Sequence, residues 1–170
     1  MADPAGQGAT GRRGGLAAIV VLAVVGFIVL ANTLHLGPAY AGLLYFWYWA
    51  VIEDAKPRAM PSSLLGALLG VGTAALLQRA VLSHQPIEII GVLVLIVAAI
   101  VVDVMRLLHF AINGCFMLFL TIASAPLIQG SENFATVVEA MMLAAAYFGL
   151  IVLALSWLQR RGDRQRGNME

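Results

Sequence analysis

The sequence predicts an all-α integral membrane protein with six transmembrane helices, and three observations support this prediction. The chain is 61% hydrophobic and 11% charged, whereas soluble domains are roughly 45–50% apolar and about 25% charged. Its apolar residues form six runs separated by short polar loops. When the six runs are taken as membrane spans, all lysines and arginines except Arg79 fall on one side of the membrane. Short loops rich in these residues stay cytoplasmic. We therefore expect a multi-pass protein of the bacterial inner membrane with both chain ends in the cytoplasm.

The first half of the predicted membrane domain covers residues 15–82 and contains three spans. The first span covers residues 15–36. The second covers residues 38–52 and reaches only about 22 Å as a helix, short of a hydrocarbon core near 30 Å. The third covers residues 61–82 and opens with a proline in its first turn. The second span is therefore expected to thin the bilayer locally, to extend its polar end into the core, or to be buried among its neighbours.

A cleaved signal peptide is the competing interpretation of the first 36 residues, with Arg12 and Arg13 as its charged start. The apolar run that follows is at the long end for such a segment, and no clear A-x-A cleavage site follows it. An uncleaved first span is therefore favoured.

The second half covers residues 86–158 and repeats this order, with spans at residues 86–108, 110–128 and 134–158. In each half a long span is followed by a shorter or interrupted one and then by a long one rich in small residues. An odd number of spans per half places the halves in opposite orientations, as in the inverted repeats of secondary transporters. Residue identity between the halves is too low to establish a repeat, so this alternative stays open.

Three small residues recur at every fourth position of the third span: Gly66, Gly70 and Ala74. Such a face lets another helix approach closely, and van der Waals packing then drives association in lipid. We expect this face to pack helices and to favour a homo-oligomer. The segments outside the membrane domain, residues 1–14 and 159–170, are polar or rich in Gly and are expected to be disordered cytoplasmic tails.

Aromatic and polar residues in the two shorter spans are the candidate lining of a solute path. The cluster from Tyr45 to Trp49 points all round a helix, so some of its rings must face protein or a cavity. An interfacial aromatic belt is the alternative. The fifth span is the most polar one, and ordinary hydrogen bonds between helices would also explain its polar residues. The candidates for the path are Tyr45, Trp47, Trp49, Asn113, Thr121 and Ser124.

Ionisable residues near the span ends are candidates for handling charge or protons. Asp103 and Arg106 are three positions apart and His109 follows after three more, so a helix would place them on one stripe. Glu53 closes the second span, and Glu139 lies five residues into the sixth. Solvated interfacial charges are the alternative, since shallow side chains reach water.

Several classes of function are excluded or disfavoured by what the sequence lacks. A net charge of +1 provides no field to recruit nucleic acid. The single Cys115 forms no intrachain disulfide, and the His and carboxylate spacings match no ligand motif, so no metal or other cofactor is expected. No known catalytic fingerprint is present, so an enzyme is not expected.

The middle of the chain resembles the membrane half of bacterial aromatic-acid-exporter proteins of the fusaric-acid-resistance type, and related small six-span proteins. The resemblance rests on the aromatic second span at residues 43–52, the polar link at 53–63 and the Gly-rich stretch LLGALLGVGTAALL at 64–77. It implies a six-helix module and efflux of small organic acids. The chain departs from that pattern because it lacks the soluble domain of those exporters and has no basic residue inside its Gly-rich stretch.

The function favoured by the sequence is that of a small-solute transporter or channel subunit, with proton coupling and a small organic molecule or acid as substrate. The alternative, from another class, is an accessory or structural subunit of a larger membrane complex that contacts protein, lipid or pigment. In that case the Gly face and the aromatic residues are contacts, and no residue handles a solute.

Overall fold

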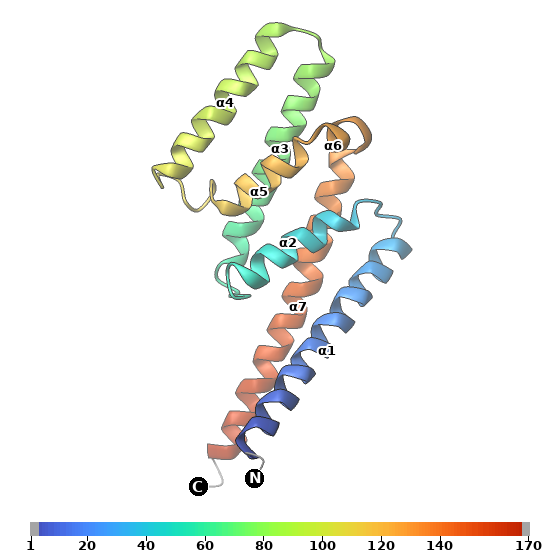
Figure 1. Cartoon of the computed structure of the whole chain (residues 1–170), viewed down its shortest axis with the longest axis vertical. Helices are drawn as coiled ribbons and strands as arrows, with labels where there is room; N and C mark the ends of the chain where they lie inside the picture. Colours follow the sequence, from blue (N-terminus) through green and yellow to red (C-terminus); the bar gives the residue numbers. More distant parts are fainter. Residues whose placement is uncertain (1–3, 168–170) are drawn as a thin grey trace.

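The computed structural model describes residues 4–167, with side chains for residues 17–158 and Arg161, and all regular structure in this part of the chain is helical. Three helical segments are long and apolar enough to cross a membrane, namely α3, α4 and the Phe134–Leu158 part of α7. Ala17–Thr33 and Gly114–Ala123 are shorter apolar segments. The helices, in chain order, are α1 (Pro4–Thr33), α2 (Ala39–Val51), α3 (Met60–Leu82), α4 (Pro86–Val104), α5 (Gly114–Ala123), α6 (Pro126–Ser131) and α7 (Phe134–Gly167) (Figure 1).

The outer surface of these helices is apolar. Leu22 on α1, Val94 on α4 and Leu150 on α7 are 72%, 63% and 68% exposed. Helix α4 is almost entirely exposed, since Ala99 is its one buried residue. Such a surface would aggregate in water but is solvated by lipid tails, so the helical structure is compatible with a membrane protein.

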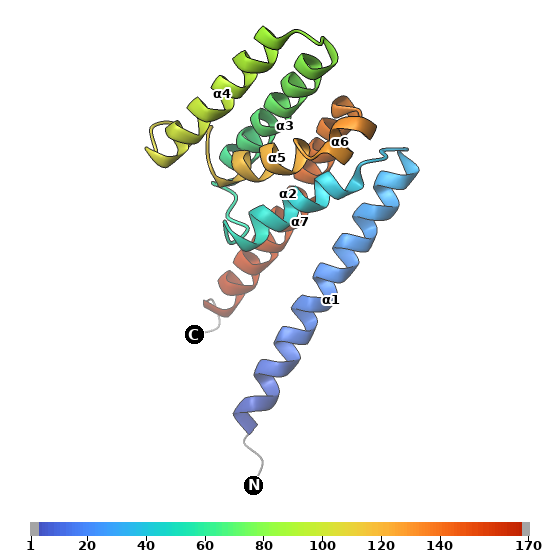
Figure 2. The same cartoon turned by 45° about the horizontal axis from the view of Figure 1, so that its top comes forward.

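The helices run back and forth along the long axis of the molecule. The beginning of α1 and the end of α7 lie at the same end, and the α3–α4 hairpin forms the opposite end (Figure 1). The short helices α2 and α5 lie across the middle in both views (Figure 1 and Figure 2). Helix α2 packs mainly on α7 and helix α5 packs mainly on α3, while α3 and α7 also contact each other. Each short helix therefore rests on a long helix from the other half of the chain.

Aromatic side chains fill the core where α2 packs on α7. Phe46 stacks on Phe148 with ring centroids 3.8 Å apart, and Phe27 of α1 lies 5.2 Å from the same ring. Gly42 permits this approach, because a β-carbon there would lie 2.5 Å from the Phe27 ring and 2.8 Å from the Ala140 carbonyl oxygen. Phe46 of α2 therefore packs on α7, and the Phe27 ring of α1 lies against both Gly42 of α2 and Phe148 of α7.

Three helices end in residues with a left-handed backbone. His35 after α1, His84 after α3 and Arg106 after α4 have φ of 55°, 53° and 53°. After α1 and α4 the following N–H groups turn back to the last carbonyls, as in a Schellman motif; after α4, Leu107 N–H donates to Val102 O at 3.2 Å. Helix α4 thus ends at Val104 and not at residue 108, the end of the fourth predicted span.

The fifth predicted span consists of two helices. Asn113 caps the start of α5, and α5 ends at Ala123. The extended backbone of Ala125 precedes Pro126, which opens the six-residue α6. A proline disfavours helical backbone in the residue before it, which explains the interruption. Helices α1 and α7 also include residues 4–14 and 159–167, the larger part of the two segments expected to be tails.

Candidate functional site

Helices α3 and α5 approach each other closely along a face of small residues on α3. A β-carbon on Gly70 would lie 2.5 Å from the Phe116 carbonyl oxygen and 3.0 Å from the Leu120 nitrogen, so only glycine fits. Gly66 faces the Asn113 side chain with still less room, and Ala74 is fully buried. The Gly66, Gly70 and Ala74 face is therefore covered by α5 of the same chain and is not free to pack against a second copy.

The first polar layer lies at the beginning of α5 and consists of Asn113 and Ser62 with the backbone around them. Asn113 Oδ1 accepts hydrogen bonds from the N–H groups of Cys115 and Phe116 at 3.0 and 3.2 Å, which caps the helix. Its Nδ2 donates to the carbonyl and hydroxyl oxygens of Ser62 at 3.0 and 3.2 Å. The Ser62 hydroxyl donates to Phe110 O at 2.9 Å. This partly buried network joins the first turns of α3 and α5.

The aromatic end of α2 borders this first layer. Tyr48 lies against Gly114, where a β-carbon would be 2.8 Å from its hydroxyl oxygen. The Tyr45 hydroxyl donates to Met60 O at 3.3 Å, and Trp49 Nε1 donates to Lys56 O at 2.9 Å. Tyr45 and Trp49 are fully buried, so their polar tips fix the α2–α3 loop.

Charged residues lie near this layer, at the end where α2 and α4 finish. Glu53 and Asp103 are both half-buried, and Tyr48 lies within electrostatic range of both carboxylates. The expected stripe of Asp103, Arg106 and His109 does not form, because α4 ends at Val104 and the left-handed backbone of Arg106 turns the chain away. Arg106 and His109 are exposed. Asp103 therefore approaches the layer without the other two.

The adjoining loop between α2 and α3 holds an exposed ion pair. Lys56 Nζ donates to Asp54 Oδ2 at 2.9 Å, and this hydrogen bond raises the pKa of Lys56 above its ordinary value. Both side chains are largely in solvent, so the pair contributes little to stability. An exposed ion pair of this kind is typical of a loop at a membrane–water interface.

The second polar layer lies at the other end of α5 and is built by two glutamines. Gln78 Nε2 on α3 donates to the Gln129 carbonyl oxygen at 2.6 Å. Gln129 Nε2 on α6 donates to Ala74 O at 3.0 Å and to Ala123 O at 2.8 Å. The bond to Ala123 O satisfies a carbonyl at the end of α5, where the helix offers no further partner, and the bond to Ala74 O joins α6 to α3. The second layer therefore stabilises the interruption of the fifth span.

A groove of about 450 Å³ opens beside this second layer. Ser124 is one of the residues that line it, and the Ser124 Oγ is the one buried side-chain polar atom in the described part of the chain that has no hydrogen-bond partner. No charged side chain lines the groove. Its lining residues are Leu77, Gln78, Val81, Leu82, Ser124, Pro126, Gln129 and Gly130.

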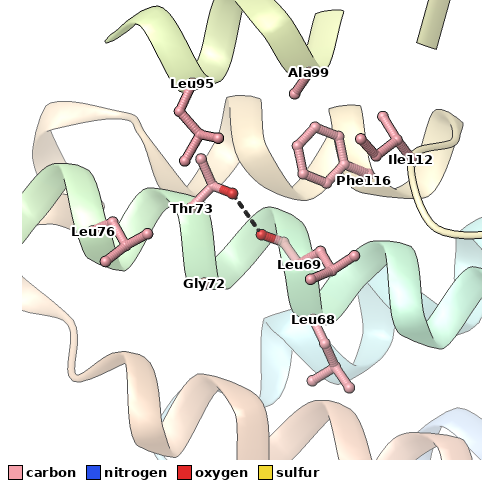
Figure 3. A pocket seen from close by; sticks show the side chains of 9 residues that line it. All are labelled: Leu68, Leu69, Gly72, Thr73, Leu76, Leu95, Ala99, Ile112 and Phe116. Atoms are coloured by element: carbon pink, nitrogen blue, oxygen red, sulfur yellow. Dashed lines mark hydrogen bonds between the residues drawn. The ribbon is translucent and has the colours of Figure 1, made fainter. Parts of the chain in front are cut away.

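A second groove, of about 410 Å³, lies between α3, α4 and α5 and differs in chemistry (Figure 3). The Thr73 hydroxyl in its wall donates to Leu69 O of its own helix at 2.8 Å (Figure 3). Its other lining residues are apolar, among them Leu95 of α4 and Phe116 of α5. This groove offers no free polar group to a solute and suits a lipid tail or an apolar side chain.

The remaining sequence-predicted candidates lie away from both layers. Trp47 is 50% exposed, as expected for a ring in contact with lipid or interface. Thr121 is exposed, and its hydroxyl donates to Met117 O of its own helix at 2.7 Å. Glu139 is exposed on α7. No group of three or more His, Cys, Asp or Glu side chains that could hold a metal ion occurs within the described residues.

Two residues of the polar layers, Ser62 and Gln78, were absent from the sequence-predicted set, and Gln129 counted only as one of the polar residues that mark the fifth span. A sequence signal existed for the glutamines, because each lies inside or next to an apolar segment, where an unpaired amide is costly. Ser62 gives no such signal, since a serine in the first turn of a helix is common.

Comparison with known proteins gives no further guide, since no family model, no curated protein and no solved structure matches this chain.

Proposed function

We propose that the protein is a small-solute transporter or channel subunit of a bacterial inner membrane. The observation that carries this proposal is the ten-residue helix α5, which has a polar layer at each end and an apolar middle. At about 1.5 Å per residue it reaches only about 15 Å, half of a hydrocarbon core. Polar groups at such depth are costly unless protein or a solute path satisfies them. A solute path that is closed in the apolar middle of α5 and has a polar layer at each end would satisfy these polar groups.

The proposed transporter has six membrane-crossing segments arranged as two inverted three-helix repeats. In this arrangement α1, α2 and α3 correspond to α4, α5 and α7. Support comes from the reciprocal packing, in which α2 rests on α7 and α5 rests on α3, while α1 contacts α7 and α4 contacts α3. Inverted repeats commonly place the solute path at the interface between the halves, with short or broken helices beside it.

Both chain ends face the cytoplasm in this proposal, and this side carries most of the basic residues. The positive-inside rule supports this orientation. Arg161 lies over the Trp157 ring, 3.6 Å from its centroid, at the same end of the molecule as the beginning of α1. A cation stacked on an interfacial tryptophan is a typical anchor at a membrane surface.

We assign the binding and release of ions or protons to the charged residues at the cytoplasmic side. Glu53 and Asp103 are half-buried near Tyr48, between the first polar layer and the basic loops. A carboxylate in such a place can exchange a proton with water and with a passing solute. The substrate class in this proposal is a small organic molecule or acid. The transporting unit is a homo-oligomer that associates through surfaces other than the Gly66, Gly70 and Ala74 face.

A second candidate function, an accessory subunit of a larger membrane complex, is favoured by the surface of α4. This helix has a mean hydropathy of 2.9, and Ala99 is its one buried residue. A partner subunit could cover it with little loss of hydrogen bonding. Lipid alone satisfies the same surface, so the transport proposal is preferred.

The test is solute flux into liposomes that contain the purified protein. Shrinkage followed by re-swelling would be recorded by stopped-flow light scattering for a panel of small amides, polyols and organic acids. An internal pH dye would report proton movement. The proposal expects at least one solute to enter faster than into protein-free liposomes. It also expects Glu53→Gln or Asp103→Asn to slow that entry about tenfold.

Glu88→Gln is the matched control, because Glu88 is an exposed carboxylate in the first turn of α4 and takes no part in either layer. It should transport at the wild-type rate. Equal rates for protein-containing and empty liposomes across the whole panel would contradict the transport proposal and favour the accessory subunit.

A further inference from the structure

The groove beside Ser124 combines features that the other grooves lack. Its wall contains a hydroxyl and two amide side chains, and the rest of the wall is apolar. It lies where α3 ends and α6 begins, away from the end of the molecule that holds the beginning of α1 and the end of α7 (Figure 1). In the orientation proposed above, the end that holds both chain ends faces the cytoplasm. In that orientation the groove belongs to the outer half of the protein.

The Ser124 hydroxyl is the polar group at this groove that lacks a hydrogen-bond partner. Its oxygen is buried and makes no hydrogen bond within the described residues. Buried hydroxyls are normally bonded, because leaving one unpaired costs about 1–3 kcal/mol. A serine hydroxyl can donate one hydrogen bond and accept others. Ser124 lines the groove, so a solute bound there supplies the missing partner once the hydroxyl turns toward it.

The two glutamines restrict the chemistry of that solute. Both Nε2 groups already donate to backbone carbonyls of α3, α5 or α6. Gln129 Nε2 has both of its hydrogens engaged, whereas Gln78 Nε2 has one of its two hydrogens engaged. No hydrogen bond within the described residues engages either Oε1 atom, so the two amides have two acceptor oxygens and one N–H donor left to offer. A carboxylate has only acceptors and no cation in the groove to balance its charge. A neutral molecule with N–H or O–H groups meets the acceptors without that penalty.

We propose that this groove is the outer recognition site for a small uncharged solute that carries both hydrogen-bond donors and acceptors, such as an amide, a polyol or an undissociated acid. The Ser124 hydroxyl forms the orienting bond, and the glutamine oxygens accept from the solute. Leu77, Val81 and Leu82 contact its apolar part. This proposal rests on the transport function proposed above and adds the substrate class and the residues that select it.

The experiment compares lactamide with lactate in liposomes that contain the wild-type protein. The two solutes have nearly the same shape, but at pH 7.5 lactate is an anion and lactamide is neutral. Entry would be measured by stopped-flow light scattering and corrected for entry into protein-free liposomes. The proposal expects protein-dependent entry of lactamide and little entry of lactate. If lactate enters faster than lactamide, the assignment of an uncharged substrate is wrong.

Three variants connect the selectivity to this groove. Ser124→Ala should slow lactamide entry about fivefold, the effect of one hydrogen bond. It should not lower the melting temperature, because the hydroxyl has no partner in the protein. Gln78→Leu should slow entry in the same direction. Thr121→Ala is the matched control, because that hydroxyl lies on the same helix but bonds to Met117 O and is exposed.

The outcomes separate this proposal from the transport function on which it rests. Lactamide entry that falls in the Ser124 and Gln78 variants but not in the Thr121 variant supports the site. Lactamide entry that is the same in all four proteins contradicts the site and leaves the transport function standing. If no solute of the wider panel enters faster than into protein-free liposomes, the transport function fails and the recognition site fails with it.

Discussion

The side chain of Asn113 occupies the space that a β-carbon on Gly66 would need, so position 66 must be glycine as long as Asn113 lies against it. Asn113 cannot move aside, because four hydrogen bonds hold it to Ser62 and to the first turn of α5. The contact fixes the start of α5 against the start of α3. Both the packing face and the first polar layer depend on it.

Substituting Gly66 tests this relationship. In Gly66→Ala the added methyl group would overlap Asn113, and the hydrogen-bond network would have to shift to make room. We expect a loss of about 1–3 kcal/mol in stability, the usual cost of overpacking a close-packed site. The measurement is the melting temperature in detergent, followed by the fluorescence of the three tryptophans.

The matched control is Gly72→Ala on the same helix, where nothing lies within 4 Å of an added β-carbon. Alanine has the higher helix propensity, so this variant should gain about 0.5–1 kcal/mol. Equal melting temperatures for the Gly66 and Gly72 variants would contradict the close contact between α3 and α5.

Removing the Asn113 side chain should also destabilise the protein. Asn113→Ala leaves the buried N–H groups of Cys115 and Phe116 without their acceptor and Ser62 without its donor. A loss of about 2 kcal/mol is expected from the cap and the unpaired groups together. Asn133→Ala is a suitable comparison, because Asn133 Oδ1 caps one exposed N–H, that of Ala135. A comparable loss of stability in that variant would contradict an additional contribution of the first polar layer.

The left-handed residues at the helix ends provide a prediction of opposite sign. His35 and His84 have φ near +55°, a conformation in which a β-carbon costs about 1–2 kcal/mol and glycine is at no disadvantage. His35→Gly and His84→Gly should each raise the stability by about 1 kcal/mol. His109→Gly is the control, because His109 has no positive φ and should not gain. Thermal melting of the three variants compares them directly, and a gain at His109 alone would contradict the helix ends described above.

The orientation in the membrane can be tested with single cysteines in a background where Cys115 is replaced by Ala. Ser131 is exposed at the end of α6, and Gly167 ends α7. In the proposed orientation, Ser131→Cys reacts with an impermeant maleimide in intact cells. Gly167→Cys reacts only after the cells are permeabilised. Reversed reactivity at either position would contradict both the six segments and their orientation.

Many of the helix boundaries were predictable from the sequence, because the residues that start and stop helices act locally. The second and third spans agree with α2 and α3 to within one residue at each end, since Pro38 and Pro61 mark their starts. Asn113 and Pro126 indicate the breaks around α5. Asparagine is a preferred N-cap residue, and proline disfavours helical backbone in the residue before it. The end of α4 was placed too late, because a left-handed arginine is not a common stop signal.

The pairing of distant segments was not predictable in the same way. The small-residue face of α3 indicated a close helix contact, but a single sequence does not say whether the partner is another chain or α5. The hydrogen bond from Gln78 to the Gln129 carbonyl and that from Asn113 to Ser62 each join residues 51 positions apart. Such contacts depend on how the helices pack, which local propensity and periodicity do not specify.

A transporter made from this chain alone requires that no other subunit be present in the native particle. The direct measurement is native mass spectrometry after gentle extraction from the source membrane into nanodiscs. The transport proposal predicts a particle whose protein mass is a whole multiple of the 18.0 kDa chain. A stoichiometric foreign subunit or a bound pigment would contradict it, and the aromatic residues and the bare face of α4 would then be contacts in a larger complex.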